Sequence, residues 1–189
     1  MVVLAAWIGA AVNTGWTADH SRSSGVILEA IKRNGAAATL RDLQSSGEWP
    51  LALQNIGMGS TAWLEVAVAL EKGADGMPGF QLTLAFGQAL EHSTEQVLSI
   101  ASVGPFDIAD ACGNYGPMQP TDRQKVLDAL ARREQAVKHV SLKRLEASRK
   151  ACLQKIDEVR ERVKAIPSGD WPRPLPRSQA IASSGADIA

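Results

Sequence analysis

Hydrophobic residues recur every three or four positions along most of the chain, which is the spacing of amphipathic α-helices. Clusters of glycine, serine and proline separate these stretches and supply helix starts and stops. The stretches expected to be helical are 25–34, 36–43, 49–56, 62–72, 80–92, 94–100 and two segments between 121 and 165. This pattern predicts an all-α fold, an array of packed helical hairpins that can curve into a superhelix.

Residues 80–86 also fit a β-strand, because Phe80, Leu82, Leu84 and Phe86 alternate with other residues. The chain offers no second strand-like segment to pair with such a strand, and unpaired backbone groups are costly. We therefore expect a helix at this position.

Three segments interrupt the helical pattern. Residues 74–79 should form a turn, and residues 103–120 an irregular connector with a short apolar segment before Cys112. The apolar stripe breaks near 140–142, so the last two helices should form a hairpin, with one continuous helix as the alternative.

The first twelve residues are an unbroken apolar run that is too short to cross a bilayer, which needs about 20 residues. Its length is typical of the hydrophobic region of a signal peptide. We therefore expect a signal peptide over 1–18, a flexible start over 19–24, a single helical domain over 25–166 and a disordered Pro/Ser-rich tail over 167–189. No Lys or Arg precedes the run, so two alternatives stay open: the true start lies upstream, or the run is a buried first helix. Export predicts a periplasmic or secreted protein.

The formal net charge of the 189 residues is zero, which gives no indication of nucleic acid or of an anionic membrane as a partner. The charge is nevertheless uneven: residues 1–120 carry a net −6 and residues 121–165 a net +6. The two parts can attract each other within one fold, or the basic part can dock on an acidic partner.

The two cysteines, Cys112 and Cys152, are expected to form one disulfide in an oxidising compartment. A nucleophilic role for Cys112 beside a histidine is the alternative, but it explains only one of the two residues.

Other candidate residues have simpler structural explanations. The glycine pair of Gly57-Met58-Gly59 lacks the lysine of a phosphate-binding loop, so a turn between helices is favoured. His20, His92 and His139 are scattered, and no metal site is expected from them. His92 falls at an expected helix end, where a cation is favourable, although it could also act in acid–base catalysis.

Three tryptophans are candidate binding residues. Trp49 and Trp63 lie in register with aliphatic residues, which favours core packing over an exposed aromatic platform. Trp171 precedes the proline-rich stretch 172–177, which could bind a groove as polyproline II or serve as a spacer. The basic residues of the last helix alternate with acidic ones, which is typical of a solvated face rather than of a nucleic-acid stripe.

Several core segments together resemble a group of uncharacterised exported proteins of Gram-negative bacteria, over roughly residues 25–157. The matching segments are Trp49…Ile56-Gly57-Met58-Gly59-Ser60-Thr61-Ala62-Trp63-Leu64, Asp75, Ala89-Leu90…Val97-Leu98 and Cys112…Arg149-Lys150-Ala151-Cys152-Leu153. The resemblance implies an exported helical domain with the two cysteines paired, and it implies no activity. The missing basic residues before the apolar run depart from a normal exported precursor.

The sequence predicts no catalytic, cofactor-binding or metal-binding residue. It favours a non-catalytic exported interaction or adaptor protein whose partner is another protein, with no nucleic acid and no stable membrane span after processing. One specific form would be an immunity-type inhibitor of a toxin. The rival hypothesis is a cell-envelope enzyme that uses His92 or His139 with a carboxylate.

Overall fold

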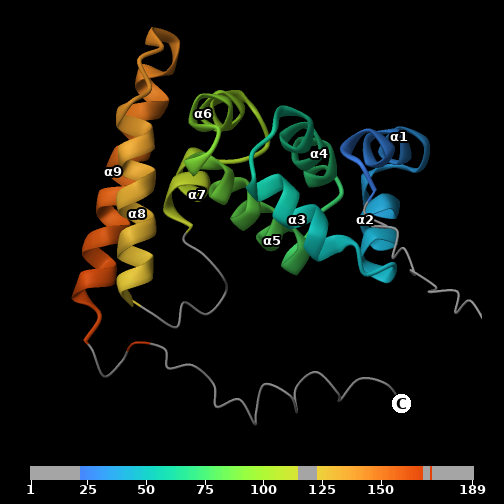
Figure 1. Cartoon of the computed structure of the whole chain (residues 1–189), viewed down its shortest axis with the longest axis horizontal. Helices are drawn as coiled ribbons and strands as arrows, with labels where there is room; N and C mark the ends of the chain where they lie inside the picture. Colours follow the sequence, from blue (N-terminus) through green and yellow to red (C-terminus); the bar gives the residue numbers. More distant parts are fainter. Residues whose placement is uncertain (1–21, 115–122, 168–170, 172–189) are drawn as a thin grey trace, which may run out of the picture.

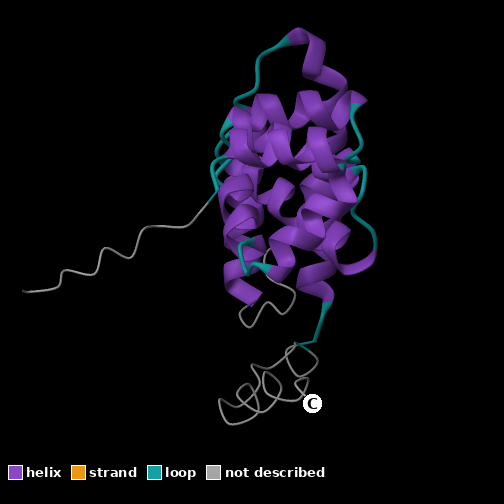
Figure 2. Ribbon diagram, turned by 90° about the vertical axis from the view of Figure 1, so that its right-hand side faces the viewer, coloured by secondary structure: helices purple, strands orange, loops and turns teal. Residues whose placement is uncertain are grey.

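The structure, a computed structural model, describes residues 22–114, 123–167 and 171. Every regular element in these residues is helical, and none is a strand (Figure 2). The α-helices are α1 (Ser24–Asn34), α2 (Ala36–Ser45), α3 (Trp49–Gly57), α4 (Thr61–Glu71), α5 (Gly76–Gln88), α6 (Thr94–Val103), α7 (Ile108–Gly113), α8 (Arg123–Lys138) and α9 (Glu146–Ala165). Two 3₁₀ turns, η1 (Ala89–Glu91) and η2 (Lys143–Leu145), precede α6 and α9. The predicted all-α class is therefore confirmed for this part of the chain.

The helices form two parts (Figure 1). Helices α1 to α7 make a two-layer array, in which α1, α4 and α6 lie over α2, α3, α5 and α7. Helices α8 and α9 form an antiparallel hairpin that packs across one end of the array, with α9 against α7. The predicted break near 140–142 is confirmed, because α8 ends at Lys138 and η2 begins at Lys143.

Local sequence explains where the helices begin and end. The Ser23 hydroxyl accepts a hydrogen bond from the Val26 N–H and caps α1, and Gly35 ends that helix with a φ of 83°. Lys32 and Arg33 lie in the last turn of α1, where the helix dipole favours cations.

Two predicted segment boundaries need correction. The expected turn over 74–79 is shorter, because α5 already begins at Gly76. Pro78 is tolerated there because the first turn of a helix does not need its N–H. The expected connector over 103–120 contains α7, which starts because the Asp107 carboxylate accepts a hydrogen bond from the Ala109 N–H at 2.6 Å.

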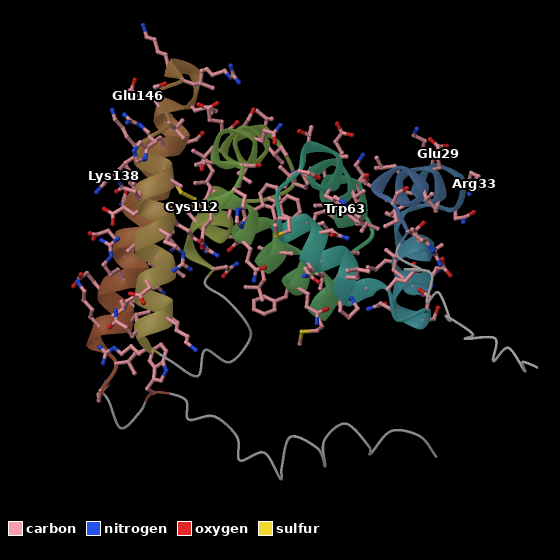
Figure 3. The ribbon with its side chains drawn as sticks, viewed as in Figure 1. Glu29, Arg33, Trp63, Cys112, Lys138 and Glu146 are labelled. Atoms are coloured by element: carbon pink, nitrogen blue, oxygen red, sulfur yellow. A yellow bond between two sulfur atoms is a disulfide. The ribbon has the colours of Figure 1, made fainter. Side chains whose placement is uncertain are left out.

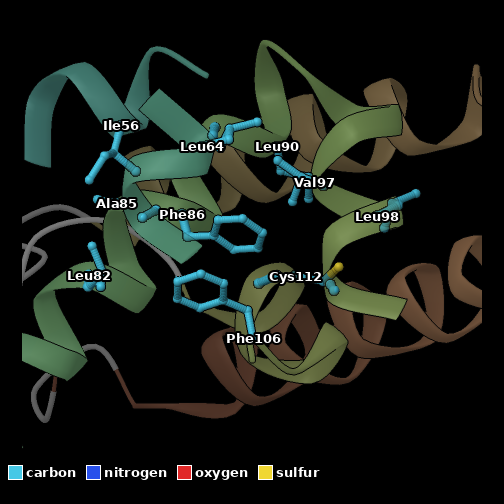
Figure 4. Close-up of a cluster of buried hydrophobic side chains, with 14 of the residues drawn as sticks. Ile56, Leu64, Leu82, Ala85, Phe86, Leu90, Val97, Leu98, Phe106 and Cys112 are labelled. Atoms are coloured by element: carbon cyan, nitrogen blue, oxygen red, sulfur yellow. The ribbon is translucent and has the colours of Figure 1, made fainter. Parts of the chain in front are cut away.

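The core of the array is a continuous set of buried aliphatic side chains around one aromatic pair (Figure 4). The rings of Phe86 and Phe106 stack with their centroids 4.0 Å apart, and both side chains are buried. Residues 80–92, for which a strand was the alternative, form α5 and η1. The helical prediction for this segment is confirmed.

Glycines allow the array helices to approach closely. A Cβ atom on Gly73 would lie 2.3 Å from the backbone nitrogen of Ala37 at the start of α2. A Cβ atom on Gly87 would lie 2.9 Å from the carbonyl oxygen of Ala111 in α7. At both positions any side chain would push against backbone that has no room to move.

A disulfide and a buried arginine attach the hairpin to the array. Cys112 of α7 is bonded to Cys152 of α9, with Cα atoms 5.4 Å apart and both residues fully buried. The predicted pairing is confirmed. The guanidinium of Arg133 in α8 donates to the carbonyl oxygen of Asn114 after α7, and its Nε lies 3.6 Å from a Glu91 carboxylate oxygen. The hairpin is thus tied to the array at α7 and at η1.

The two ends of the described chain carry contacts that the sequence did not indicate. Arg22 forms ion pairs with Asp42 and Glu48, so the fold begins within the segment 19–24 that we expected to be a flexible start. Trp171, inside the expected tail 167–189, packs against the core. The predicted signal peptide, the start up to residue 21, and tail residues 168–170 and 172–189 lie outside the described residues. Among the described helices, none has the length and apolar character needed to span a membrane.

Candidate functional site

Two of the three histidines meet at one hollow. His92 lies just before α6 and His139 just after α8, and both side chains are exposed. They line an open hollow of about 490 Å³ where the start of α6 faces the end of α8. The other lining residues are Ser93, Thr94, Glu95, Gln96, Ala136 and Val140. In the sequence the two histidines stand 47 positions apart, so their spacing gives no sign of a shared site. The hairpin brings them together only in the folded chain. His20 lies outside the described residues.

Hydrogen bonds within the hollow fix several of its side chains. His139 Nδ1 lies 2.7 Å from the carbonyl oxygen of Gln135, and since a carbonyl only accepts, Nδ1 donates; in the neutral imidazole Nε2 is then an acceptor. Gln96 Nε2 donates to Thr61 Oγ1 at 2.7 Å, and Thr94 Oγ1 donates to the Leu90 carbonyl at 2.8 Å. The hollow therefore presents a pre-arranged polar surface.

The hollow opens beside the turn of the hairpin, which projects beyond the array in both views (Figures 1 and 2). We call residues 138–150 the cationic tip, because they hold five basic residues and one acidic residue. Two of the basic residues are held by carboxylates of their own helix: Lys138 by Glu134 at 2.6 Å and Lys150 by Glu146 at 3.0 Å. Figure 3 labels Lys138 and Glu146 on the hairpin. Lys143, Arg144 and Arg149 have no ion-pair partner among the described residues.

An ion cluster at η1 and α8 supports the wall of the hollow. Glu91 binds Arg132 at 2.8 Å and contacts the buried Arg133. Burial lowers the pKa of Arg133 below its ordinary value, and the nearby Glu91 charge opposes that shift. Because one buried cation contacts both Glu91 and Asn114, the start of α6 is fixed relative to α8.

The remaining face of the hairpin is a mixed-charge surface, as the sequence predicted. Its ion pairs include Lys155 with Glu158 at 2.9 Å and Lys164 with Glu161 at 2.8 Å. The hydrogen bond from Lys138 and the charge of Arg160 lower the pKa of Glu134. Among the described residues these contacts neutralise most of this face, although Arg162 also lacks an ion-pair partner there, and they leave three such cations together at the tip.

The other candidates from the sequence have structural roles. Cys112 is bonded to Cys152, so its sulfur is not a nucleophile here. Gly57 ends α3, and Met58 and Gly59 lie in the turn to α4, with Gly59 at a φ of 76°. Trp49 is buried and its indole N–H donates to Gln81 Oε1 at 2.7 Å, while Trp63 packs against the core. Core packing is therefore confirmed for both tryptophans. The indole N–H of Trp171 is buried without a partner among the described residues, and the stretch 172–177 lies outside them.

A second open hollow, of about 560 Å³, lies at the start of α2 and is lined in part by Arg41 and Lys72. Both side chains are exposed, and the hollow brings no acid or histidine to them. In the part of the chain that the structure describes, no three His, Cys, Asp or Glu side chains gather as metal ligands would.

Comparisons with protein-family models, with curated proteins and with solved structures found no match to this chain. The class defined by the structure is an all-α protein in which a disulfide links a helical array to a C-terminal hairpin.

Proposed function

We propose that the protein is a non-catalytic exported interaction protein, an adaptor of the periplasm or of the secreted space, which binds another protein through the cationic tip. One observation carries this proposal. The tip projects from the array on a hairpin held by a buried disulfide, and it presents Lys143, Arg144 and Arg149 without ion-pair partners among the described residues. A rigid, exposed and charged projection is suited to contact with another molecule.

Export is supported by the apolar run at residues 1–12 and by the cysteine pair, because disulfides persist in oxidising compartments. Mass spectrometry of the protein recovered from its native cell checks this part of the proposal. We expect a mature chain that lacks residues 1–18 and has no free thiol. A chain that keeps those residues and stays reduced inside the cell would contradict export.

The enzyme hypothesis required His92 or His139 to reach a carboxylate in a deep cleft. Both histidines instead line an open hollow, and His139 is hydrogen-bonded to the backbone of its own helix. Glu95 lines the same hollow, but no ion pair joins it to either histidine among the described residues. This geometry favours binding over acid–base chemistry.

Site-specific photo-crosslinking tests the binding proposal. A crosslinking amino acid is placed at Ser141, which is exposed on the tip, and in a matched variant at Gln44, which is exposed on α2 at the other end of the array. We expect one protein partner to crosslink in the native cell from position 141 and not from position 44. Equal crosslinking from both positions, or none from either, would contradict a binding role for the tip.

A further inference from the structure

We infer that the cationic tip and the adjoining hollow together bind an acidic, extended segment of the partner protein. This inference rests on the proposed function and adds the chemistry of the ligand. Lys143 and Arg144 follow Val140, which lines the hollow, by three and four residues. Their backbone is therefore no more than about 11 and 14 Å from it, within reach of one short peptide.

The charges of the tip match an acidic ligand. Lys143 and Arg144 are exposed, and Arg149 is partly exposed. η2, which carries the first two, packs against α6, so the cations stand beside the wall of the hollow and not apart from it. Arginine and lysine form strong charge-assisted hydrogen bonds with carboxylates, and one arginine can bind a carboxylate through two parallel hydrogen bonds.

The hollow adds groups that recognise a peptide. His139 Nε2 can accept a hydrogen bond from a peptide N–H, and the Ser93 hydroxyl has no side-chain hydrogen bond among the described residues. The buried Val140 and the half-buried Ala136 line the hollow with apolar surface. Polar groups that hold a backbone, beside cations that hold side chains, fit an extended acidic segment.

The same residues do not fit a membrane surface. The exposed large hydrophobic side chains of the described chain are Val26, Met58, Met77, Phe80 and Val103. None of them belongs to residues 138–150, which the structure describes completely. Binding to a lipid surface draws on buried apolar area in addition to charge, and the tip offers only charge.

Glu95 gives the site a direction. It is the one carboxylate among the residues that line the hollow, and it lies on the α6 side. A negative charge there repels acidic side chains within about 10 Å. Acidic residues of the ligand should therefore lie toward Lys143 and Arg144, and its uncharged residues toward Glu95.

Fluorescence anisotropy with a defined probe tests this inference. The probe is a fluorescein-labelled synthetic peptide of alternating Glu and Ser, with alternating Gln and Ser as the uncharged control, and the protein is the full oxidised chain. We expect salt-sensitive binding of the acidic peptide only. The double variant Lys143→Glu/Arg144→Glu should bind at least about tenfold more weakly, and Glu95→Gln about two- to threefold more tightly.

The matched control is Arg41→Glu/Lys72→Glu, which changes the net charge equally at exposed positions on the other hollow. It should bind the peptide as the wild type does. Equal loss in both double variants, or no binding by the wild type, would overturn the inference. So would tip-dependent binding to phosphatidylglycerol vesicles without binding to the peptide, or salt-sensitive self-association in sedimentation. If position 141 still crosslinks to a partner while the peptide fails, the proposed function stands and only the acidic ligand is wrong.

Discussion

The array and the hairpin are built from different kinds of sequence. The array uses short helices of six to thirteen residues, and its described residues 22–114 contain five basic and ten acidic side chains. The hairpin uses helices of 16 and 20 residues, and residues 123–167 contain thirteen basic and six acidic side chains. The two parts meet along one boundary, where α9 packs against α7 and α6, and α8 packs against η1 and α6.

This difference indicates where the stability of each part resides. Short helices are marginal alone and depend on tertiary packing. In the array that packing is apolar and close, with glycines at the contacts of α2 with α4 and of α5 with α7. The hairpin buries a single stripe on each helix, such as Val126 and Leu130 on α8, and adds one covalent bond to the array. We therefore expect loss of the disulfide to destabilise mainly the hairpin, and added side-chain volume at helix contacts to destabilise mainly the array.

Removal of the disulfide should have the largest effect. Cys112→Ala/Cys152→Ala opens a loop of 40 residues' separation, and the chain-entropy relation assigns such a loop up to about 4 kcal/mol of the free energy of unfolding. Equilibrium unfolding in guanidinium chloride measures the loss. Hydrogen exchange should show that amides of α8 and α9 lose more protection than those of α4. A loss below about 1 kcal/mol, or equal loss of protection in both parts, would contradict the comparison.

The unmodified protein provides the control for that experiment. Both cysteines are fully buried, so a reductant should open the bond slowly in the folded protein and rapidly once denaturant is added. Thiol titration with and without denaturant distinguishes the two rates.

A single methyl group should have the next largest effect when it is added at a close helix contact. Gly73→Ala places a carbon 2.3 Å from the backbone nitrogen of Ala37, so the turn after α4 must move away from the start of α2, at a cost of about 1–3 kcal/mol. Gly25→Ala is the matched control, because nothing lies within 4 Å of its added carbon. In helix α1 it should stabilise the protein by about 0.4–1 kcal/mol. Thermal unfolding should show a lower melting temperature for Gly73→Ala and a higher one for Gly25→Ala. Equal destabilisation by both variants would contradict the role of the close contact at Gly73.

The sequence predicted the helices well because local residues mark where helices begin and end. Gly35 ends α1, and the interruption after Lys138 separates α8 from α9. The early start of α5 and the presence of α7 were missed for local reasons. Pro78 and Asp107 occur at helix starts, but the residues around them are typical of turns. The disulfide could be predicted because only two cysteines exist.

The candidate site could not be predicted in the same way. The meeting of His92 with His139 depends on how α8 crosses the end of the array, and that crossing is fixed by Arg133. Position 133 is in register with the apolar stripe of α8, but an arginine gives no hydrophobic signal of burial. The excess of positive charge after residue 120 was visible, but its unpaired part became clear only once the ion pairs of the hairpin were known. Tertiary contacts, and not local propensity, therefore create this site.

The smallest expected effect concerns Glu71, a carboxylate of the array. Carboxylates of the hairpin form ion pairs with lysine or arginine, and Glu71 forms none among the described residues. Glu71 ends α4, where the helix dipole disfavours negative charge, and one of its oxygens is buried without a hydrogen bond among the described residues. Burial raises its pKa above the ordinary 4.5, so the folded chain holds this proton to a higher pH than the unfolded chain, and stability falls as the pH rises through that interval. Glu71→Gln should therefore stabilise the protein at neutral pH, and solvent screening keeps the gain within about 0.3–1 kcal/mol.

The difference in stability should vanish in acid, below the ordinary pKa of the carboxyl group. The control is Glu65→Gln, exposed on the same helix, which should change stability little at any pH. Unfolding measured across this pH range would contradict the assignment if Glu71→Gln weakened the fold at neutral pH, because the carboxylate would then have a stabilising partner.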